Sequence, residues 1–505
     1  MIEILQTHFG MPEFRRGQRE IISSILEGKD VLAVLPTGGG KSLCYQYPAL
    51  ALNKLVIVVS PLIALMKDQV SSLEKLGIPA GSLHSAQSQA EKKEVFRKMA
   101  AGQGFVLYLS PERTQKEGFQ GWLKTVDVGL FAVDEAHCVS QWGHDFRAEY
   151  SQLKSLKLLK PNVPVLALTA SATPFVLNDI ARQLGLKSPV KHVHGFYRPN
   201  LYYQVEFCED DDVKLEALRQ SLRQNPSGRI LIYCGTRKVT EELTQILSGE
   251  FSGVDYYHAG LANEKRNSTQ EAYSEGKVRI LIATNAFGMG IDHPDVRLVV
   301  HYQMPANIDS LYQEMGRAGR DGQNSTCILL YAKKDKGLQS FFIQRSEAPA
   351  EVQNSRWRAL ENLIDYCEGS ECRHAEILTY YKDSQRLQRC GHCDVCDPSS
   401  SRRVQKPVSI VKTVIRKISK RKTAQAPTVL TPDDNRIFEI LKLWRREKAR
   451  ELDVPAFVIF SDRTLRHLAQ ARPKERDQLK DIFGLGEAKI ERFGSELLNG
   501  PLAEA

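Results

Sequence analysis

The amino-acid sequence predicts an α/β fold with two similar lobes in tandem, each built on a parallel sheet with helices on both faces. Short runs of β-branched and apolar residues alternate with helical stretches from residue 31 to about residue 186, and the same alternation restarts after Asn200. At 505 residues the chain is also too long for a single hydrophobic core. We therefore expect two α/β lobes followed by smaller domains.

The expected elements follow one another in a regular order. The expected strands are residues 31–35, 55–60, 105–110, 129–134 and 165–169 in the first lobe, and 230–234, 254–258, 278–284, 298–302 and 327–331 in the second. From Ser346 the pattern changes to helices, then to a cysteine cluster and a basic segment, and residues 433–498 are helical again, with a turn at Gly484 and Gly486. These changes predict domains at residues 1–194, 195–345, 346–400 and 431–505, with 401–430 as a linker.

A glycine-rich turn follows the first expected strand and opens a helix. Its sequence, Thr-Gly-Gly-Gly-Lys-Ser, lets backbone N–H groups approach phosphate oxygens, while Lys41 can reach the β and γ phosphates and Ser42 can ligate Mg²⁺. The strict eight-residue pattern has glycine where this chain has Leu35, so the turn alone is a partial match. The residues expected to bind a nucleoside triphosphate here are Leu35, Pro36, Thr37, Gly38, Gly39, Gly40, Lys41 and Ser42.

Two carboxylates come directly after another expected strand of the first lobe. Asp134 and Glu135 end the apolar run 129–133, so both should lie at the carboxyl edge of the sheet, beside the glycine-rich turn. Asp134 can hold Mg²⁺ through water, and Glu135 can polarise the attacking water. Together with Lys41, they predict a triphosphatase.

Two arginines lie on a glycine-punctuated turn of the second lobe. Arg317 and Arg320 follow Gln313 in the segment 313–320, and such arginines can point at the γ phosphate across a cleft between lobes. Hydrolysis would then depend on closure of the lobes. The alternative is that both arginines form surface salt bridges.

Four cysteines predict one metal site. Cys372, Cys390, Cys393 and Cys396 offer four thiolates, which suit tetrahedral Zn²⁺ in a structural role because no position stays open for water. The remaining six of the ten cysteines are scattered, which argues against a disulfide framework. Cys367 and His392 are rival ligands, and a set of unmetallated, reduced thiols is the other alternative.

The net charge of +9 is concentrated in one segment. Residues 401–425 hold nine basic residues and no acid, so the rest of the chain is balanced. Such a segment suggests contact with a polyanion, of which nucleic acid is the expected one, or else a solvated linker. The basic residues are Arg402, Arg403, Lys406, Lys412, Arg416, Lys417, Lys420, Arg421 and Lys422.

These features together resemble the ordered motifs of RecQ-type superfamily 2 DNA helicases of the DEAH-box group. The resemblance covers about residues 5–400 and again the last 75 residues, and its most specific part is the aromatic-rich loop 140–147. The motifs are residues 14–18, 36–42, 60–69, 134–137, 140–147, 168–173, 283–292 and 313–322. The resemblance implies two RecA-like lobes, a helical zinc-binding module and an all-helical HRDC domain.

The resemblance also assigns roles to individual residues. Gln18 would pair with the adenine edge, and Arg15 would lie against the base, so that ATP is preferred. The family often has an aromatic residue where this chain has Met11. Gln313 would contact the nucleotide, and Ser171 and Thr173 would couple the lobes.

Aromatic side chains in the loop after Asp134 are expected to contact DNA. Trp142 and Phe146 could stack on bases, at about 1–3 kcal/mol per base, with Arg147 beside them. The alternative is that Trp142 and Phe146 pack within the lobes.

The chain departs from the family after the zinc site. Many RecQ proteins have a winged-helix domain of roughly a hundred residues there, whereas only residues 398–432 separate the module from the HRDC block, which is too short. Apolar residues at helical spacing among the basic ones predict an amphipathic basic helix that takes over part of the missing duplex contact by charge. A membrane-surface helix is a weak alternative, because the segment has no aromatic residue.

The sequence therefore predicts an ATP-dependent DNA helicase that uses ATP, Mg²⁺ and Zn²⁺. The resemblance implies 3′ to 5′ movement, a role in recombination, replication or repair, and single-strand-binding protein or topoisomerase as further partners. No apolar run approaches the roughly 20 residues of a membrane span, so we expect no membrane partner and a cytoplasmic, nucleoid-associated protein, or a nuclear one in a eukaryote. The alternatives are an RNA helicase, or a DNA-binding or strand-annealing protein with weak ATPase activity.

Overall fold

The chain folds into two compact units. One consists of residues 1–346 and 362–407, the other of residues 347–361 and 408–505. The computed structural model describes the chain except for Thr37, Ala86, Ser384, Ser461, Gly486 and residues 102–103, 143–145, 289–292, 405–430, 452–458, 483–484 and 504–505. The predicted basic helix and the predicted turn at Gly484 and Gly486 therefore lie outside the described residues.

The first lobe is a seven-stranded sheet in the order β3-β4-β2-β5-β6-β1-β7, with every pair parallel. Its strands are β1 Val31–Val34, β2 Leu55–Val59, β3 Ala80–Leu83, β4 Val106–Leu109, β5 Val128–Val133, β6 Val165–Thr169 and β7 Val190–Val193. Its helices are α1 Ile2–Phe9, α2 Gln18–Leu26, α3 Leu43–Leu52, α4 Ile63–Lys75, α5 Gln89–Ala101, α6 Glu117–Thr125, α7 Lys154–Leu159 and α8 Pro174–Leu184, with short 3₁₀ turns η1 Pro111–Gln115, η2 Ala136–Val139 and η3 Ala148–Gln152.

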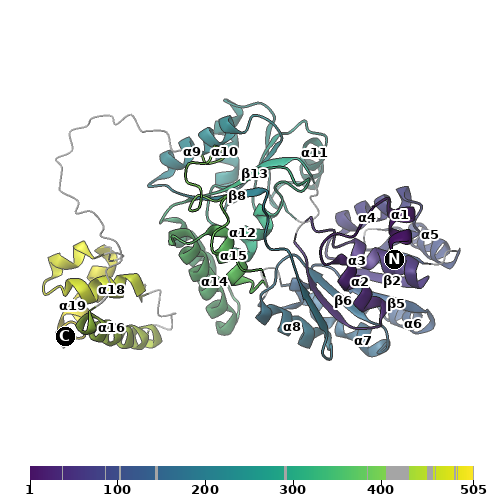
Figure 1. Cartoon of the computed structure of the whole chain (residues 1–505), viewed down its shortest axis with the longest axis horizontal. Helices are drawn as coiled ribbons and strands as arrows, with labels where there is room; N and C mark the ends of the chain where they lie inside the picture. The colour runs from purple at the N-terminus through teal and green to yellow at the C-terminus, as the bar shows by residue number, and fades with distance from the viewer. Residues whose placement is uncertain are drawn as a thin grey trace. The chain divides into compact units, whose positions relative to one another are not determined.

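The second lobe is a six-stranded parallel sheet in the order β10-β11-β9-β12-β13-β8. Its strands are β8 Leu201–Phe207, β9 Arg229–Tyr233, β10 Val254–Tyr257, β11 Ile280–Ala283, β12 Val296–His301 and β13 Ser325–Tyr331. Its helices are α9 Asp211–Gln224, α10 Arg237–Ser248, α11 Asn263–Ser274, α12 Ile308–Met315 and α13 Asp335–Gln344 (Figure 1). The two predicted α/β lobes are confirmed.

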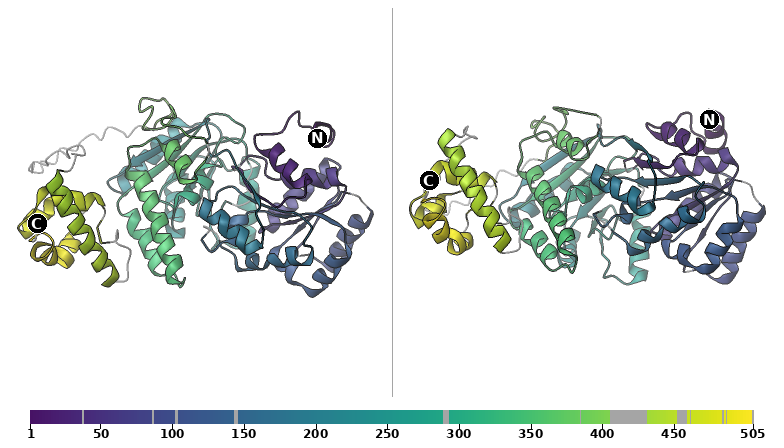
Figure 2. Two further views of the ribbon diagram at one scale, coloured as in Figure 1. Left: turned by 60° about the horizontal axis from the view of Figure 1, so that its bottom comes forward. Right: turned by 90° about the horizontal axis from the view of Figure 1, so that it is seen from below.

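Hydrophobic residues explain both sheets. Strands β2, β5 and β6 of the first lobe and β11 and β13 of the second are buried along their whole length, as expected when helices cover both faces of a parallel sheet (Figure 2). Three strands escaped sequence prediction. β3 contains Gly81, β7 is only half-buried, and β8 alternates apolar with polar residues instead of forming an apolar run.

The remaining helices follow the second lobe. They are α14 Ala350–Glu368, α15 Arg373–Tyr380, α16 Pro432–Glu451, α18 Asp462–Ala471 and α19 Glu487–Asn499, with the 3₁₀ turn η4 Arg476–Asp481. Helices α16, α18 and α19 enclose a small core of their own, which includes Leu441, Phe460, Leu465 and Leu497. Within the described part of the chain, no helix is long and apolar enough to cross a bilayer.

Candidate active site and metal centre

The glycine-rich turn leaves the carboxyl end of β1 and leads into α3. Leu35 donates its N–H to Thr169 O at 3.1 Å, which continues the parallel pairing, and Gly39 N then turns back to Pro36 O at 2.9 Å. Gly38 and Gly40 have φ values of +80° and +74°, a conformation that other residues adopt at a cost. The strand, turn and helix start were therefore predicted correctly. Thr37 lies outside the described residues.

Arg15 and Gln18 hold this turn in place. Arg15 Nη1 donates to Gly38 O at 2.6 Å, and Gln18 Nε2 donates to Gly40 O at 3.0 Å and to Gly39 O at 3.3 Å. The side-chain oxygen Oε1 of Gln18 accepts a hydrogen bond from the backbone N–H of Arg15 at 2.8 Å, and the Gln18 side chain is buried. Both residues thus lie at the predicted nucleotide site. In this conformation the Gln18 side-chain amide donates to carbonyl groups of the turn, so adenine recognition by Gln18 stays a prediction.

Asp134 and Glu135 lie at the end of β5, as predicted. Asp134 N donates to Val59 O at 2.9 Å, which ties the carboxylate to the sheet edge. Burial, followed by the charge of Glu135, raises the pKa of Asp134 to about 7, and Lys41 opposes this rise. Glu135 adopts a left-handed conformation with φ of +48°. Such strained backbone is found where function requires a particular side-chain direction.

A chain of polar contacts runs from Glu135 to the second lobe. Glu135 Oε2 lies 3.3 Å from His137 Nδ1, and His137 Nδ1 lies 3.0 Å from Thr169 Oγ1. Thr169 Oγ1 accepts from Ser171 N at 3.3 Å. Ser171 Oγ then accepts from Gln313 Nε2 at 3.0 Å. The carboxylate is thereby connected to the helix α12 that precedes the arginine turn.

His137 and Thr169 were missed as members of this chain of contacts, although both occur in motifs that carry the family resemblance. Thr173 has a different role from the predicted coupling contact, because its hydroxyl accepts from Val176 N at 3.4 Å and caps α8. Ser171 is thus the residue of this turn that reaches the other lobe.

The two arginines of the turn 316–323, called here the finger loop, have different environments. A Cβ placed on Gly38 would lie only 3.3 Å from Cγ of Arg320, so Arg320 comes from the second lobe to the glycine-rich turn of the first. Arg317 is buried inside the second lobe, and a Cβ on Gly288 would lie 2.8 Å from its guanidinium. In this conformation Arg320 is the arginine that faces the nucleotide site.

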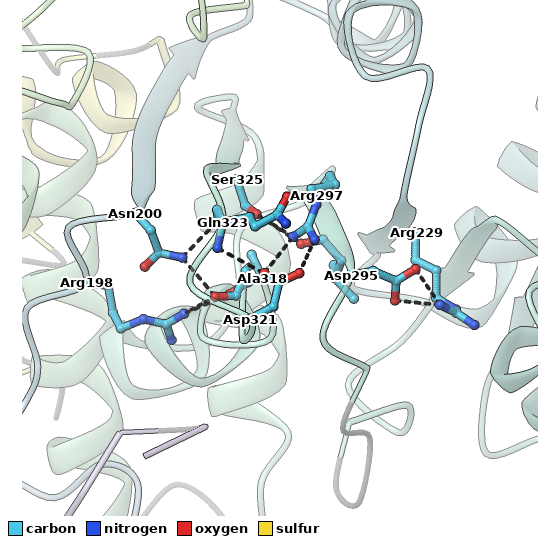
Figure 3. Close-up of polar contacts among 11 residues, drawn as sticks. Arg198, Asn200, Arg229, Asp295, Arg297, Ala318, Asp321, Gln323 and Ser325 are labelled. Atoms are coloured by element: carbon cyan, nitrogen blue, oxygen red, sulfur yellow. Dashed lines mark hydrogen bonds and ion pairs between the residues drawn. The ribbon is translucent and has the colours of Figure 1, made fainter. Parts of the chain in front are cut away.

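The finger loop is fixed by polar contacts from several directions (Figure 3). Arg198 donates to Ala318 O at 2.9 Å, and Asn200 donates to Gly319 O at 2.8 Å. Arg297 forms an ion pair with Asp321 at the far end of the loop. Sequence reasoning missed all three residues, because their partners are mostly backbone carbonyls.

The four predicted cysteines meet in one place. The sulfur atoms of Cys372, Cys390, Cys393 and Cys396 all lie within 4.8 Å of one another, as one tetrahedral metal ion requires. Hydrogen bonds from Cys390 and Cys393 lower the pKa of Cys372, which favours the thiolate. The rival Cys367 is not part of this group, and burial raises its pKa.

The other rival, His392, belongs to a second group of possible ligands. Its Nδ1 lies 2.7 Å from Cys390 O, and it forms a cluster with His374 and Cys390 that shares a sulfur with the first group. The four-thiolate set is complete without it.

The predicted DNA-contact residues are only partly described. Phe146 is 39% exposed, and Trp142 packs edge to face against Phe175 with ring centroids 5.7 Å apart. Phe175, which is 61% exposed, escaped sequence reasoning and enlarges this aromatic surface. The predicted contacts Lys412, Arg416, Lys417, Lys420, Arg421 and Lys422 lie outside the described residues.

The predicted arginines that are described already bind protein acceptors. Arg147 donates to Pro61 O at 3.2 Å, Arg402 to Asn200 O at 3.2 Å, and Arg403 to Pro398 O at 3.2 Å. Arg402 also lies over the ring of Tyr202 at 5.4 Å. A DNA contact by any of the three stays a prediction, and for Arg402 it would have to replace these contacts.

Four family models match the chain in succession. They describe a DEAD/DEAH box helicase at residues 15–180, a helicase conserved C-terminal domain at 213–322, a RecQ zinc-binding domain at 333–397 and an HRDC domain at 434–499.

Known proteins are similar over most of the chain. "ATP-dependent DNA helicase RecQ" of Bacillus subtilis is 34% identical over 574 aligned positions, which cover 97% of this chain and 96% of the relative. "Putative ATP-dependent RNA helicase R290" of Acanthamoeba polyphaga mimivirus is 40% identical, covering 78% of this chain and 71% of the relative. The solved structure of S. cerevisiae Dbp5 with RNA and ADP BeF3 is 17% identical, with a TM-score of 0.54, and covers 71% of this chain and 97% of Dbp5.

Replacing Gly40 by Ala is expected to weaken ATP binding about tenfold or more, because the left-handed conformation costs about 1–2 kcal/mol for other residues. The new Cβ would in addition clash with Gln18 Nε2. Titration with a fluorescent ATP analogue measures the affinity. Gly28→Ala is the matched control, because Gly28 has φ of +77° but no atom within 4 Å of the place that its Cβ would take. Equal affinities of the two variants would contradict this prediction.

Proposed function

The chain belongs to the RecQ family of ATP-dependent DNA helicases, and from this membership we propose that it moves along single-stranded DNA and unwinds forked duplexes by hydrolysing ATP between its two lobes. It is an enzyme, an ATP-dependent DNA helicase. The observation that carries the proposal is the approach of Arg320 from the second lobe to Gly38 of the first. An ATP site divided in this way makes hydrolysis depend on the relative position of the lobes.

The residues of the site would have different roles in phosphoryl transfer. Lys41 and the N–H groups of the glycine-rich turn would hold the β and γ phosphates, and Ser42 with Asp134 would hold Mg²⁺. Glu135 would orient the attacking water. Arg320, with Arg317 behind it, would stabilise the charge that develops on the γ phosphate, a contribution that can reach roughly 10³ to 10⁵ in rate.

The aromatic loop would relay DNA binding to this site. It follows η2, which begins directly after Glu135. Ser140 Oγ donates to Asp179 Oδ2 at 2.7 Å and accepts from Trp142 N at 3.2 Å, so the start of the loop is fixed to α8. A base stacked on Trp142 and Phe175 would thus act close to both the carboxylates and Ser171.

The cysteine group would hold Zn²⁺ in a structural role. Asp394, which lies between Cys393 and Cys396, accepts from Arg373 at 3.0 Å and from Val205 N of β8 at 3.1 Å. A metal bound here therefore also fastens the module to the edge strand of the second lobe. Such metals supply roughly 10–16 kcal/mol of apparent folding free energy in small modules.

A basic segment follows the zinc module, where many RecQ proteins have a winged-helix domain. The alignment with the Bacillus subtilis relative spans 574 positions against 505 residues here, so the relative has at least 69 residues without a counterpart (574 minus 505). This difference agrees with the short stretch between the zinc module and the HRDC domain. We infer that the basic residues of 401–425 contact duplex phosphates in place of part of that domain.

Family resemblance suggests the finer properties of the enzyme. These are 3′ to 5′ movement, a role in recombination, replication or repair, a cytoplasmic and nucleoid-associated location, and contacts with single-strand-binding protein or topoisomerase. An RNA helicase is the competing function, because one relative carries that name.

Replacing Lys41 by Ala is expected to abolish ATP hydrolysis and unwinding, while affinity for single-stranded DNA stays within about twofold, since the proposed role of Lys41 is to hold phosphates of ATP and not DNA. Lys29→Ala is the control, because that exposed lysine pairs with Glu27 ahead of β1, at the opposite end of the strand from the turn. Strand separation and ATPase rates are measured with single-stranded DNA and with RNA of the same sequence. Unwinding by the Lys41 variant would refute the assigned site, and stronger stimulation by RNA would favour the competing function.

One zinc ion per chain is expected in the purified protein, measured by mass spectrometry after dialysis against a mild chelator. Cys393→Ser should lose the ion, because Cys393 is fully buried and belongs to the four-sulfur group. Cys367→Ser is the matched control, since Cys367 is also buried but lies outside that group. Loss of zinc from both variants alike would argue against the proposed ligands.

Replacing six basic residues of the linker by glutamine is expected to flatten the salt dependence of duplex binding. These residues are Lys412, Arg416, Lys417, Lys420, Arg421 and Lys422. Six phosphate contacts correspond to a slope of about 5 in log K against log salt, since each contributes about 0.9. Titration of forked DNA at several salt concentrations measures it. A variant with the same residues in scrambled order tests whether charge alone suffices, and an unchanged slope after neutralisation would rule out the contact.

A further inference from the structure

The segment that joins the two lobes also holds the finger loop. Residues 194–200 lie between β7, the last strand of the first lobe, and β8, the first strand of the second. We call residues 196–200 of this segment the connector. Two of its side chains, Arg198 and Asn200, reach the finger loop more than a hundred residues further along the chain (Figure 3).

Arg198 binds the loop at the end of helix α12. Its guanidinium donates to Gly316 O at 3.3 Å, Ala318 O at 2.9 Å and Gly319 O at 3.1 Å. Carbonyl groups at the C-terminus of a helix have no partner within the helix and carry partial negative charge. A planar cation with several donors therefore fits this position, and it fixes the backbone on both sides of Arg317.

Asn200 binds the next part of the same loop. Its amide nitrogen donates to Gly319 O at 2.8 Å and to Gln323 O at 3.0 Å, so it holds the two ends of the turn together. Gly319 has φ of +55°, and a Cβ there would lie 2.5 Å from this nitrogen. Glycine at this position thus permits the contact directly before Arg320.

The connector is itself held firmly, so it can act as a reference point. Phe196 N donates to Asp383 Oδ2 at 3.1 Å, and the Phe196 ring stacks on Tyr381 at 4.0 Å. On the other side Arg402 donates to Asn200 O. Asp383, Tyr381 and Arg402 thereby contact the connector, which in turn binds the finger loop.

We propose that Arg198 and Asn200 are positioning residues for ATP hydrolysis, which fix the finger loop to the connector so that Arg320 meets the γ phosphate when the lobes close. The proposal rests on the proposed function, because it assumes that Arg320 acts on the nucleotide. Both residues bind carbonyl groups of the loop, so both act through its backbone. The finger is thus set by the segment about which the lobes move.

Arg229 serves as a matched control that distinguishes positioning of the finger loop by Arg198 from a purely structural role of Arg198. Arg229 forms an ion pair with Asp295 at 2.5 Å and donates to Tyr273 O and Ser274 O in the same lobe. Figure 3 shows this pair apart from the finger loop. Arg198→Ala and Arg229→Ala therefore remove comparable numbers of hydrogen bonds, but only the first releases the loop.

The experiment measures DNA-stimulated ATPase kinetics and thermal stability of the full chain for Arg198→Ala, Asn200→Ala, Arg198→Lys, Arg229→Ala and Arg320→Ala. For Arg198→Ala we expect kcat to fall about 10- to 100-fold with KM for ATP within about twofold, because a displacement near 1 Å at a catalytic group can cost about a hundredfold. Asn200→Ala and Arg198→Lys should give smaller losses. Arg229→Ala should lower the melting temperature similarly and keep kcat within about threefold.

Each result has a distinct meaning. Equal losses of kcat in Arg198→Ala and Arg229→Ala, or a normal kcat in Arg198→Ala, would overturn the proposal while leaving the function of the site intact. Should Arg198→Ala fail to fold, a normal kcat in both Asn200→Ala and Arg198→Lys would overturn it instead. A normal kcat in Arg320→Ala would show that the finger role itself is wrong, and the inference would fall with it.

Discussion

The approach of Arg320 to the glycine-rich turn is the contact on which the proposed mechanism depends. The turn belongs to one parallel sheet and the arginine to another, and Gly38 can take its φ of +80° beside Arg320 only because it has no side chain. Each lobe has a hydrophobic core of its own, and the residues proposed to bind and hydrolyse ATP are divided between the two lobes. Under the proposed function this division would link the chemical step to a movement of whole lobes, because the developing charge on the nucleotide would be stabilised fully only when both halves are present.

Two routes of contact connect the lobes around this site. One is polar and runs from Glu135 through His137 and Thr169 to Ser171 and Gln313, so it connects the Glu135 carboxylate with the second lobe. The other is covalent and runs through the connector. Both end on the same element, because Gln313 lies on α12 and Arg198 binds the carbonyl groups at the end of α12.

The sequence was sufficient for most strands of the two sheets and for residues of strongly restricted type. Apolar runs identified ten of the strands, glycines and Lys41 identified the phosphate turn, and cysteine spacing identified the metal group. Arg198 and Asn200 could not be found in this way, because their partners are backbone carbonyls whose proximity arises only after folding. Gln18 shows the same limit, since the sequence did not reveal that its amide donates to Gly40 O, while the adenine contact implied by the family resemblance stays a prediction. Strand β8 escaped because it alternates Tyr202, Gln204 and Glu206 with apolar residues.

The anchoring of the basic segment changes how its charge can be used. Val404 is fully buried in the core of the second lobe, and its backbone exchanges two hydrogen bonds with the Gln204 side chain at 2.8 and 2.9 Å. Arg402, just before it, binds Asn200 O and Tyr202. The segment therefore starts from the lobe that carries the finger loop. Under the proposed phosphate contact, DNA would thus be tied to that lobe through charge, which does not depend on sequence, and not through the shape of a folded domain.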